Sequence, residues 1–164
     1  DTDQAKQKMS WKDVGIILLF YLAGRVIAVA GTVINQLVSG NQMSMNDQAI
    51  FGLTAGLKEG FLPFTICFLL VIGIVAPIIE ELVFRGLASQ LLFSGRNKWL
   101  AAIVTSLIFG LLHASNLIEW IMYTGLGIVF YLAYARRRNI KDSILLHMIN
   151  NIPSAIFIAF AIFS

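Results

Sequence analysis

The decisive stretch of this chain is FLPFTICFLLVIGIVAPIIEELVFRGLASQLLF, residues Phe61–Phe93. It is apolar over most of its length, and its second half carries Glu80, Glu81 and Arg85. A helix that spans a bilayer needs about 20 mostly apolar residues, and backbone groups in hydrocarbon must be bonded within the chain. The stretch is therefore expected to be a membrane helix. Charged groups inside such a helix are costly and indicate a functional site.

The composition of the whole chain agrees with a membrane location. Hydrophobic residues make up 58% of the 164 residues and charged residues only 13%, whereas a soluble domain is about 25% charged. We expect a single membrane-embedded domain over residues 1–164, with its motif-bearing core at about 61–163. The polar lead Asp1–Ser10 lacks the pattern of a signal peptide, so none is expected.

Four further segments share the apolar character of Phe61–Phe93. We expect membrane helices at Val14–Val38, Trp99–His113, Leu117–Tyr134 and Ile140–Phe163, with turns at 94–97, 114–116 and 136–139. The polar stretch Ser39–Gly60 is expected to contain a short interfacial helix over Asp47–Leu57. The predicted fold class is all-α, a polytopic bundle of about five transmembrane helices. Small residues within the spans predict close helix contacts at Gly24, Gly31, Ser106, Gly110, Gly125 and Gly127.

The basic residues predict the orientation of this bundle. Five crossings place nine of the 12 Lys and Arg residues on one side and only Lys58 on the other. Because positive loops stay in the cytoplasm, the N-terminus is predicted to be cytoplasmic and the C-terminus external in a multi-pass protein of the cell membrane. The net charge of +3 is explained in this way, and no nucleic-acid partner is expected. The nine residues are Lys6, Lys8, Lys12, Arg96, Lys98, Arg136, Arg137, Arg138 and Lys141.

Two adjacent carboxylates in the decisive stretch are expected to have different environments. Glu81 and Arg85 are four residues apart and share one helical face, which favours an ion pair. Glu80 points about 100° away from Glu81, so it can face another partner. Arg85 would keep Glu81 ionised while Glu80 remains free to take up a proton, an arrangement that suits acid–base chemistry. The alternative is a structural ion pair with an acid at the membrane interface.

The only two histidines of the chain both lie in apolar segments. His147 and Asn151 are four residues apart and can both donate hydrogen bonds to an oxygen atom; Asn150 lies near the same face, so spacing does not choose between the two asparagines. Alternatively, His113 is structural and the His147–Asn151 pair only bonds helices together. Taken with Glu80, the set offers a base for water, a group to orient it and donors for an oxyanion.

Two other residues bear on the site. Pro77 precedes Glu80 by three residues and cannot donate a hydrogen bond to the Gly73 carbonyl, so the helix is expected to loosen beside Glu80 or simply to kink there. Arg25 lies about 20 Å past Lys12 in the first span. It is expected to face the interior and to pair with Glu80, Glu81 or a substrate carboxylate, unless the helix begins late and leaves Arg25 at the interface.

Three motifs occur in order on hydrophobic segments, and together they resemble the signature of the CAAX protease and bacteriocin-processing family, also called the Abi family. The family pattern reads Glu-Glu-x-x-x-Arg, then Phe-x-x-x-His, then His-x-x-x-Asn or Asp. The resemblance covers roughly Phe61 to Phe163. The matching residues are Glu80-Glu81 with Arg85, Phe109 with His113, and His147 with Asn151.

The resemblance implies an intramembrane endopeptidase that depends on glutamate and needs neither a cofactor nor a metal. It implies that Glu80 and His113 activate water, and that His147 and Asn151, rather than Asn150, stabilise the oxyanion. Glu81 and Arg85 would support the site. The implied substrate is a membrane-associated peptide or CAAX-like protein, and a bacterial precursor peptide is expected.

Two other functions are consistent with the sequence. A zinc-dependent membrane protease could use Glu80, His113 and His147 as a site with two histidines and one carboxylate, although the chain has no His-Glu-x-x-His string. A membrane scaffold or bacteriocin-immunity protein without catalysis would use the same polar residues only to hold helices together.

Overall fold

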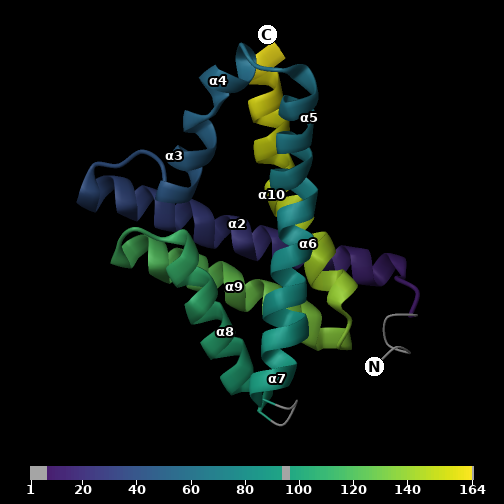
Figure 1. Ribbon diagram of the computed structural model, residues 1–164. Helices are drawn as coiled ribbons and strands as arrows, with labels where there is room; N and C mark the ends of the chain where they lie inside the picture. Colours follow the sequence, from purple (N-terminus) through teal and green to yellow (C-terminus); the bar gives the residue numbers. More distant parts are fainter. Residues whose placement is uncertain (1–6, 94–96, 164) are drawn as a thin grey trace.

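The computed structural model describes residues 7–93 and 97–163, which form helices joined by short connections (Figure 1). The predicted all-α membrane bundle is confirmed for these residues. The helices outside the decisive stretch are α2 (Trp11–Ser39), α3 (Met45–Gly52), α4 (Thr54–Lys58), α8 (Lys98–His113), α9 (Leu117–Arg137) and α10 (Ile140–Phe163).

The decisive stretch forms one helical rod. It consists in order of α5 (Leu62–Leu70), η1 (Val71–Val75), α6 (Ala76–Glu81), η2 (Leu82–Ala88) and α7 (Ser89–Phe93). The elements η1 and η2 are π-helical, which means that the backbone hydrogen bonds there reach one residue further than in an α-helix. Such bulges are frequent at functional sites.

The number of spans differs from the prediction. Among the described residues, four helices are long and apolar enough to cross a membrane: Trp11–Ser39, Leu62–Leu91, Leu117–Arg137 and Ile140–Phe163. The predicted span at Trp99–His113 does form a helix, α8, but it has only 16 residues. At 1.5 Å per residue it covers about 24 Å, less than the hydrocarbon thickness of about 30 Å.

Some predicted boundaries also change. The interfacial helix is two short helices, α3 and α4, and α3 begins early because the Ser44 side chain accepts a hydrogen bond from the Asp47 N–H. Helix α9 continues past Tyr134 to Arg137 and ends where Arg138 has a positive φ of 52°. The predicted turn at 114–116 is confirmed. The turn at 94–97 lies outside the described residues except for Asn97, whose side chain caps α8.

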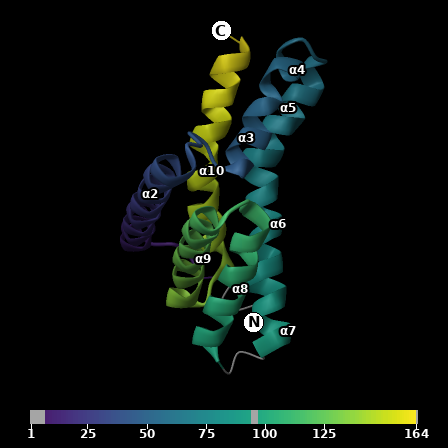
Figure 2. The same cartoon turned by 90° about the vertical axis from the view of Figure 1, so that its left-hand side faces the viewer.

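Two pairs of long helices organise the molecule. Helix α10 packs along the upper part of the rod, beside α5, η1 and α6, and α2 packs beside α9 (Figures 1 and 2). In Figure 1, α2 and α9 run crosswise to the rod. Helix α8 returns from the foot of the rod and packs on α9. The centre of the rod, with α6, therefore lies close to α8, α9 and α10 together.

Small residues permit the closest of these contacts, as predicted. A Cβ atom on Gly31 of α2 would lie 2.5 Å from the Met122 side chain of α9. A Cβ atom on Gly110 of α8 would lie 2.9 Å from the carbonyl oxygen of Trp120 and would also overlap Thr124. Real Cβ atoms do not approach so closely, so helix α9 is held against both α2 and α8 by positions without a side chain.

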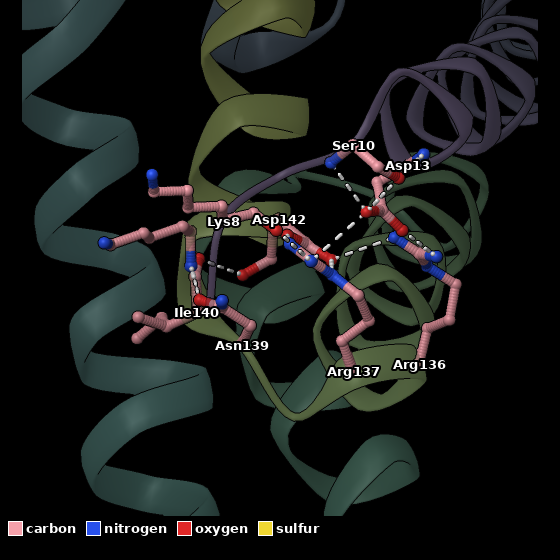
Figure 3. Close-up of polar contacts among 10 residues, drawn as sticks. Lys8, Ser10, Asp13, Arg136, Arg137, Asn139, Ile140 and Asp142 are labelled. Carbon is pink, nitrogen blue, oxygen red and sulfur yellow. Dashed lines mark hydrogen bonds and ion pairs between the residues drawn. The ribbon is translucent and has the colours of Figure 1, made fainter. Parts of the chain in front are cut away.

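A cluster of charges closes one end of the bundle (Figure 3). Arg136 bonds to Asp13 at 2.7 Å and to Asp142 at 3.1 Å. Arg137 bonds to the same two carboxylates, at 3.3 and 2.7 Å. The two arginines therefore connect the start of α2 to the junction of α9 and α10. This places two of the predicted cytoplasmic segments together, while Lys6 and Arg96 lie outside the described residues.

A polar network orders the other end of α2. The buried carboxylate of Glu119 accepts hydrogen bonds from Asn35 Nδ2 at 3.2 Å, from the Met45 N–H at 3.2 Å and from the Ser115 N–H at 2.9 Å. These donors come from α2, the start of α3 and the turn between α8 and α9. The network fixes α3 against the helix hairpin that carries His113.

The orientation remains a prediction, and it can be tested by labelling. In a Cys67→Ala background, an impermeant maleimide should modify exposed Lys141→Cys only after the cell membrane has been opened, because Lys141 is predicted to be cytoplasmic. Exposed Lys58→Cys is the matched control and should be modified in intact cells. Modification of Lys141→Cys in intact cells would reverse the predicted orientation.

Candidate active site

The predicted site residues line one cavity. Its volume is about 370 Å³, and its walls come from α2, α3, the rod, α8, α9 and α10. Glu80, His113, His147 and Asn151 all lie on its surface. Glu81 and Arg85 lie behind this surface and are completely buried.

Glu80 of α6 is at the centre of the group. Its Oε2 atom lies 3.7 Å from Nε2 of His113 and 3.7 Å from Nε2 of His147. These distances exceed a direct hydrogen bond of about 2.7–3.2 Å. The Glu80 side chain is 27% exposed. The two imidazoles thus direct the same ring atom toward one carboxylate oxygen, Oε2, which is itself buried and has no hydrogen-bond partner among the described residues.

His113 is held at the end of α8. Its Nδ1 lies 2.8 Å from the carbonyl oxygen of Phe109, which can only accept, so the Nδ1–H donates. The ring also packs on the Phe109 ring, with centroids 4.3 Å apart, and lies 5.4 Å from the Tyr123 ring of α9. In the neutral ring, the Nε2 atom that faces Glu80 consequently carries the lone pair.

His147 of α10 is held by a carboxylate instead. Its Nδ1 lies 2.9 Å from Oε1 of Glu81, so the Nδ1–H donates to that oxygen. The ring stacks on Phe130 of α9 with a centroid distance of 4.3 Å. Glu81 and Phe130 together fix the ring plane and direct Nε2 at Glu80.

Glu81 and Arg85 form the predicted ion pair. Arg85 Nη1 donates to Oε1 of Glu81 at 3.1 Å, and neither side chain has exposed surface. Arg85 Nη2 donates to the carbonyl oxygen of Gly127 on α9 at 2.7 Å. Glu80 points away from this pair, as the helical geometry predicted, and the two adjacent acids therefore have different surroundings.

Three phenylalanine rings surround the buried guanidinium. The Arg85 Cζ atom lies 5.8, 5.2 and 5.7 Å from the ring centroids of Phe84, Phe109 and Phe130. Aromatic faces attract cations at such distances, most strongly where water is excluded. Arg85 thus links the rod to α8 and α9 through its hydrogen bonds and through these rings.

The loosened helix expected before Glu80 is present as the π-helical segment η1. The Ala76 N–H donates to the carbonyl of Val71, one residue beyond its α-helical acceptor Ile72. In the same register the donor to the Ile72 carbonyl would be Pro77, which has no N–H. Asn151 Nδ2 of α10 donates to this carbonyl at 3.3 Å. The proline and the bulge therefore create the acceptor that positions Asn151.

The other asparagine, Asn150, joins the site to α2. Its Nδ2 donates to Oδ1 of Asn151 at 3.2 Å, and its Oδ1 accepts from Arg25 Nη1 at 3.4 Å. The structure does not place Arg25 in the expected ion pair with Glu80 or Glu81, because Glu81 is occupied by Arg85 and His147 and Glu80 faces the histidines. Helix α2 begins at Trp11, so the alternative of a late start is wrong.

Several residues of the site have no signal in the sequence. Phe130 is one of 12 phenylalanines, and nothing in the pattern distinguishes it as the platform for His147. Gly127 was expected only to permit close packing, yet its carbonyl also binds Arg85. Tyr123 lies beside His113 and bonds to Ser44 at 2.8 Å. The contacts of the Gly127 carbonyl and of the Phe130 and Tyr123 rings depend on how the helices pack. The sequence pattern does not specify that packing.

The geometry of a possible metal site is described by two kinds of distance. Zinc ligands lie about 2.0–2.2 Å from the ion for nitrogen and oxygen donors. Within residues 7–93 and 97–163, no group of three His, Cys, Asp or Glu side chains is arranged to hold a metal ion. In the zinc alternative the three ligands would be Glu80, His113 and His147, and Glu80 Oε2 lies 3.7 Å from Nε2 of each histidine.

Comparison with known families identifies this arrangement. The family model described as "Type II CAAX prenyl endopeptidase Rce1-like" matches residues 62–153, which include all seven motif residues from Glu80 to Asn151. The chain belongs to this family. The resemblance inferred from the three motifs is thereby confirmed. No solved structure matches the chain.

Two curated relatives of this Rce1-like chain come from bacteria. YdiL of Bacillus subtilis (strain 168) is 30% identical over 143 residues, which are 84% of this chain and 55% of YdiL. The membrane-embedded CAAX protease MroQ of Staphylococcus aureus (strain USA300) is 31% identical over 130 residues, 75% of this chain and 49% of MroQ. The chain thus spans about half the length of the curated relatives it matches.

The buried ion pair predicts a large effect on stability. Arg85→Ala should lower the free energy of unfolding by about 3–5 kcal/mol, because Glu81 would remain as an uncompensated buried charge. Unfolding by sodium dodecyl sulfate in mixed micelles measures this energy. The exposed Lys12→Ala is the control and should change it by less than about 0.5 kcal/mol.

Replacing both charged residues distinguishes two causes of lost stability, an unpaired buried charge and a loss of side-chain packing. The double variant Glu81→Leu with Arg85→Met should recover a substantial part of the stability lost in Arg85→Ala, because no unpaired charge remains. The two single variants, Glu81→Leu and Arg85→Met, are measured beside it. If the double variant loses as much free energy of unfolding as the two single variants together, the unpaired charge is not the cause of the instability.

Proposed function

We propose that this chain forms the catalytic core of an intramembrane endopeptidase in which Glu80 and His113 activate a water molecule. The observation that carries the proposal is the convergence of two imidazole Nε2 atoms on one oxygen of Glu80, at the surface of a cavity between membrane helices. A cavity with convergent polar groups is the usual setting of hydrolysis.

The first step uses Glu80 as the general base. A water molecule that hydrogen-bonds to Glu80 and to the His113 Nε2 lone pair attacks the scissile carbonyl carbon, and its proton passes to the Glu80 carboxylate. The tetrahedral intermediate then breaks its C–N bond. The leaving amine takes the proton back from Glu80, so the products are a carboxylic acid and an amine and the enzyme is regenerated.

The second requirement is stabilisation of the oxyanion. Asn151 donates one Nδ2 hydrogen to Ile72 and has a second hydrogen for a substrate oxygen. His147 already donates its Nδ1–H to Glu81, so it can donate from Nε2 only when both ring nitrogens are protonated. The Glu81 carboxylate is the group that would balance the charge of that imidazolium. Glu81 and Arg85 are therefore proposed as supporting residues.

The proposed substrate is a membrane-associated peptide or a CAAX-like protein. The family is named for CAAX prenyl endopeptidase activity, and one relative is named a CAAX protease. Because the relatives are bacterial, a bacterial precursor peptide is the preferred substrate. The bilayer is the other partner, and the proposed reaction needs neither a cofactor nor nucleic acid.

Glu80→Gln should abolish peptide cleavage while the protein still folds, because the amide cannot accept the proton of water. Purified protein in liposomes is incubated with a quenched-fluorescent pool of apolar peptides and with a farnesylated CAAX peptide, and products are identified by mass spectrometry. The expected loss is at least about 100-fold. His113→Ala should cause a comparable loss.

The matched control is Glu59→Gln, which changes an exposed acid outside the cavity and should leave cleavage unchanged. Near-normal turnover by Glu80→Gln would remove Glu80 from the mechanism. No cleavage by the wild-type protein would favour the scaffold or immunity function.

The zinc alternative makes the opposite prediction about chelation. Under the proposed mechanism, exhaustive treatment with a chelator should leave the cleavage rate within about twofold of its initial value, because carboxylate and imidazole groups alone activate the water. Loss of activity that zinc alone restores, together with one bound zinc per chain in elemental analysis, would favour the zinc protease.

A further inference from the structure

Arg25 is a cation that the proposed mechanism does not use. It lies half-buried in α2, about 21 Å from Trp11 at 1.5 Å per residue. If α2 crosses the membrane along its length, a guanidinium at this distance from the helix end would not reach the interface easily. It lines the same cavity as Glu80 and Asn151. A charged residue at such a position normally pairs with an opposite charge or lines a substrate path.

No carboxylate of the described residues neutralises Arg25 directly. Its hydrogen bond goes to the neutral amide oxygen of Asn150, at 3.4 Å, and no acidic side chain lies within ion-pair distance. Glu81 is taken by Arg85 and His147. Asp47 of α3 lines the cavity, and its partial burial raises the pKa of this carboxyl, a rise that the charge of Arg25 only partly offsets.

The position of Arg25 relative to the reacting groups follows from the two asparagines. Asn150 accepts from Arg25 at 3.4 Å and donates to Asn151 at 3.2 Å, so one amide side chain separates the guanidinium from the proposed oxyanion donor. An extended peptide covers about 3.3–3.6 Å per residue. A group bound by Arg25 would thus lie about three residues or fewer from the scissile bond.

We propose that Arg25 binds a carboxylate of the peptide substrate and thereby selects where the chain is cut. The guanidinium can form two parallel hydrogen bonds with a carboxylate, a stronger interaction than the single bond to Asn150. The carboxylate is either the C-terminus of the peptide or an acidic side chain close to the cleaved bond. This inference rests on the proposed function for its role in cleavage, but the anion site itself does not require catalysis.

Arg25 lies outside the residues that match the Rce1-like family model. It belongs to α2, which packs on α9 and contributes to the cavity from the side opposite the rod. The family motifs would supply the hydrolytic groups, and α2 would supply the selectivity. A relative with a different residue at this position would accordingly select a different substrate end.

The test measures binding without cleavage. N-acetyl-Leu-Leu-Leu with a free carboxylate and the same tripeptide with a C-terminal amide are titrated into the full-length wild-type chain in non-ionic detergent, with calorimetry as the readout. The acid should bind at least about tenfold more tightly than the amide, because a charge-assisted hydrogen bond is lost in the amide.

Variants assign that preference to Arg25. Arg25→Gln should bind the acid and the amide equally, and Arg25→Lys should retain part of the preference because it keeps the charge without the planar fork. Lys12→Gln removes an exposed cation from the same helix and should retain the full preference. Thermal unfolding of each variant in the same detergent checks that the fold is kept.

The outcomes are distinct from those of the cleavage assay. Equal binding of acid and amide by the wild-type chain, or no binding of either, would overturn the anion site, as would a preference that survives Arg25→Gln. A third peptide, N-acetyl-Leu-Leu-Asp amide, identifies the source: tight binding shows that a side-chain carboxylate suffices, and binding as weak as the amide shows that the C-terminus is required.

Discussion

An arginine with no exposed surface has to be neutralised where it lies, and Arg85 meets this requirement through Glu81 and the Gly127 carbonyl. The same contacts join four elements, because Glu81 also accepts from His147 of α10 and Arg85 packs against Phe109 of α8. Since either charge alone would be strongly destabilising in this position, the helices must assemble with the pair complete. The geometry of the site follows from that assembly.

Backbone irregularity serves the site in the same way. In a regular helix each interior carbonyl already accepts from the backbone N–H four residues later, so a side chain of another helix has to share it, as Arg85 shares the Gly127 carbonyl. Pro77 and the π-helical segment η1 leave the Ile72 carbonyl to Asn151, about two helical turns before Glu80. The interruption therefore bonds the rod to α10 on the N-terminal side of Glu80.

The cavity combines two kinds of polar group on opposite walls. The rod, α8 and α10 contribute the acid, the imidazoles and the amide of the proposed hydrolysis, while α2 contributes Arg25. Asn150 and Asn151 connect the two walls by hydrogen bonds. In the proposed protease, a fixed link between Arg25 and the proposed oxyanion donor would couple the reactive centre to a defined register of the peptide.

Local patterns in the sequence were enough to predict the bilayer environment, the helical class and most residues of the candidate site. The length of the apolar segments predicts the spans. Ionisable residues inside a bilayer are costly, so their presence in apolar helices indicates functional residues. This argument selects Glu80, Glu81, Arg85 and the two histidines. Helical spacing also separates Glu80 from the Glu81–Arg85 face. These are properties of short segments, so they can be predicted without knowing which helices touch.

The partners of those groups follow from the packing of the helices in three dimensions. The spacing of four residues could not choose between Asn150 and Asn151, which differ in whether they contact Ile72 or Arg25. From the sequence, Arg25 was expected to pair with a carboxylate. The packing of α2 beside α10 places it against the side-chain amide of Asn150 instead. The fifth predicted span fell short because α8 begins after the Asn97 cap and ends at His113, where the backbone of Ala114 becomes extended, so that the helix has only 16 residues. Contacts between distant segments depend on helix crossings, and no local pattern specifies those.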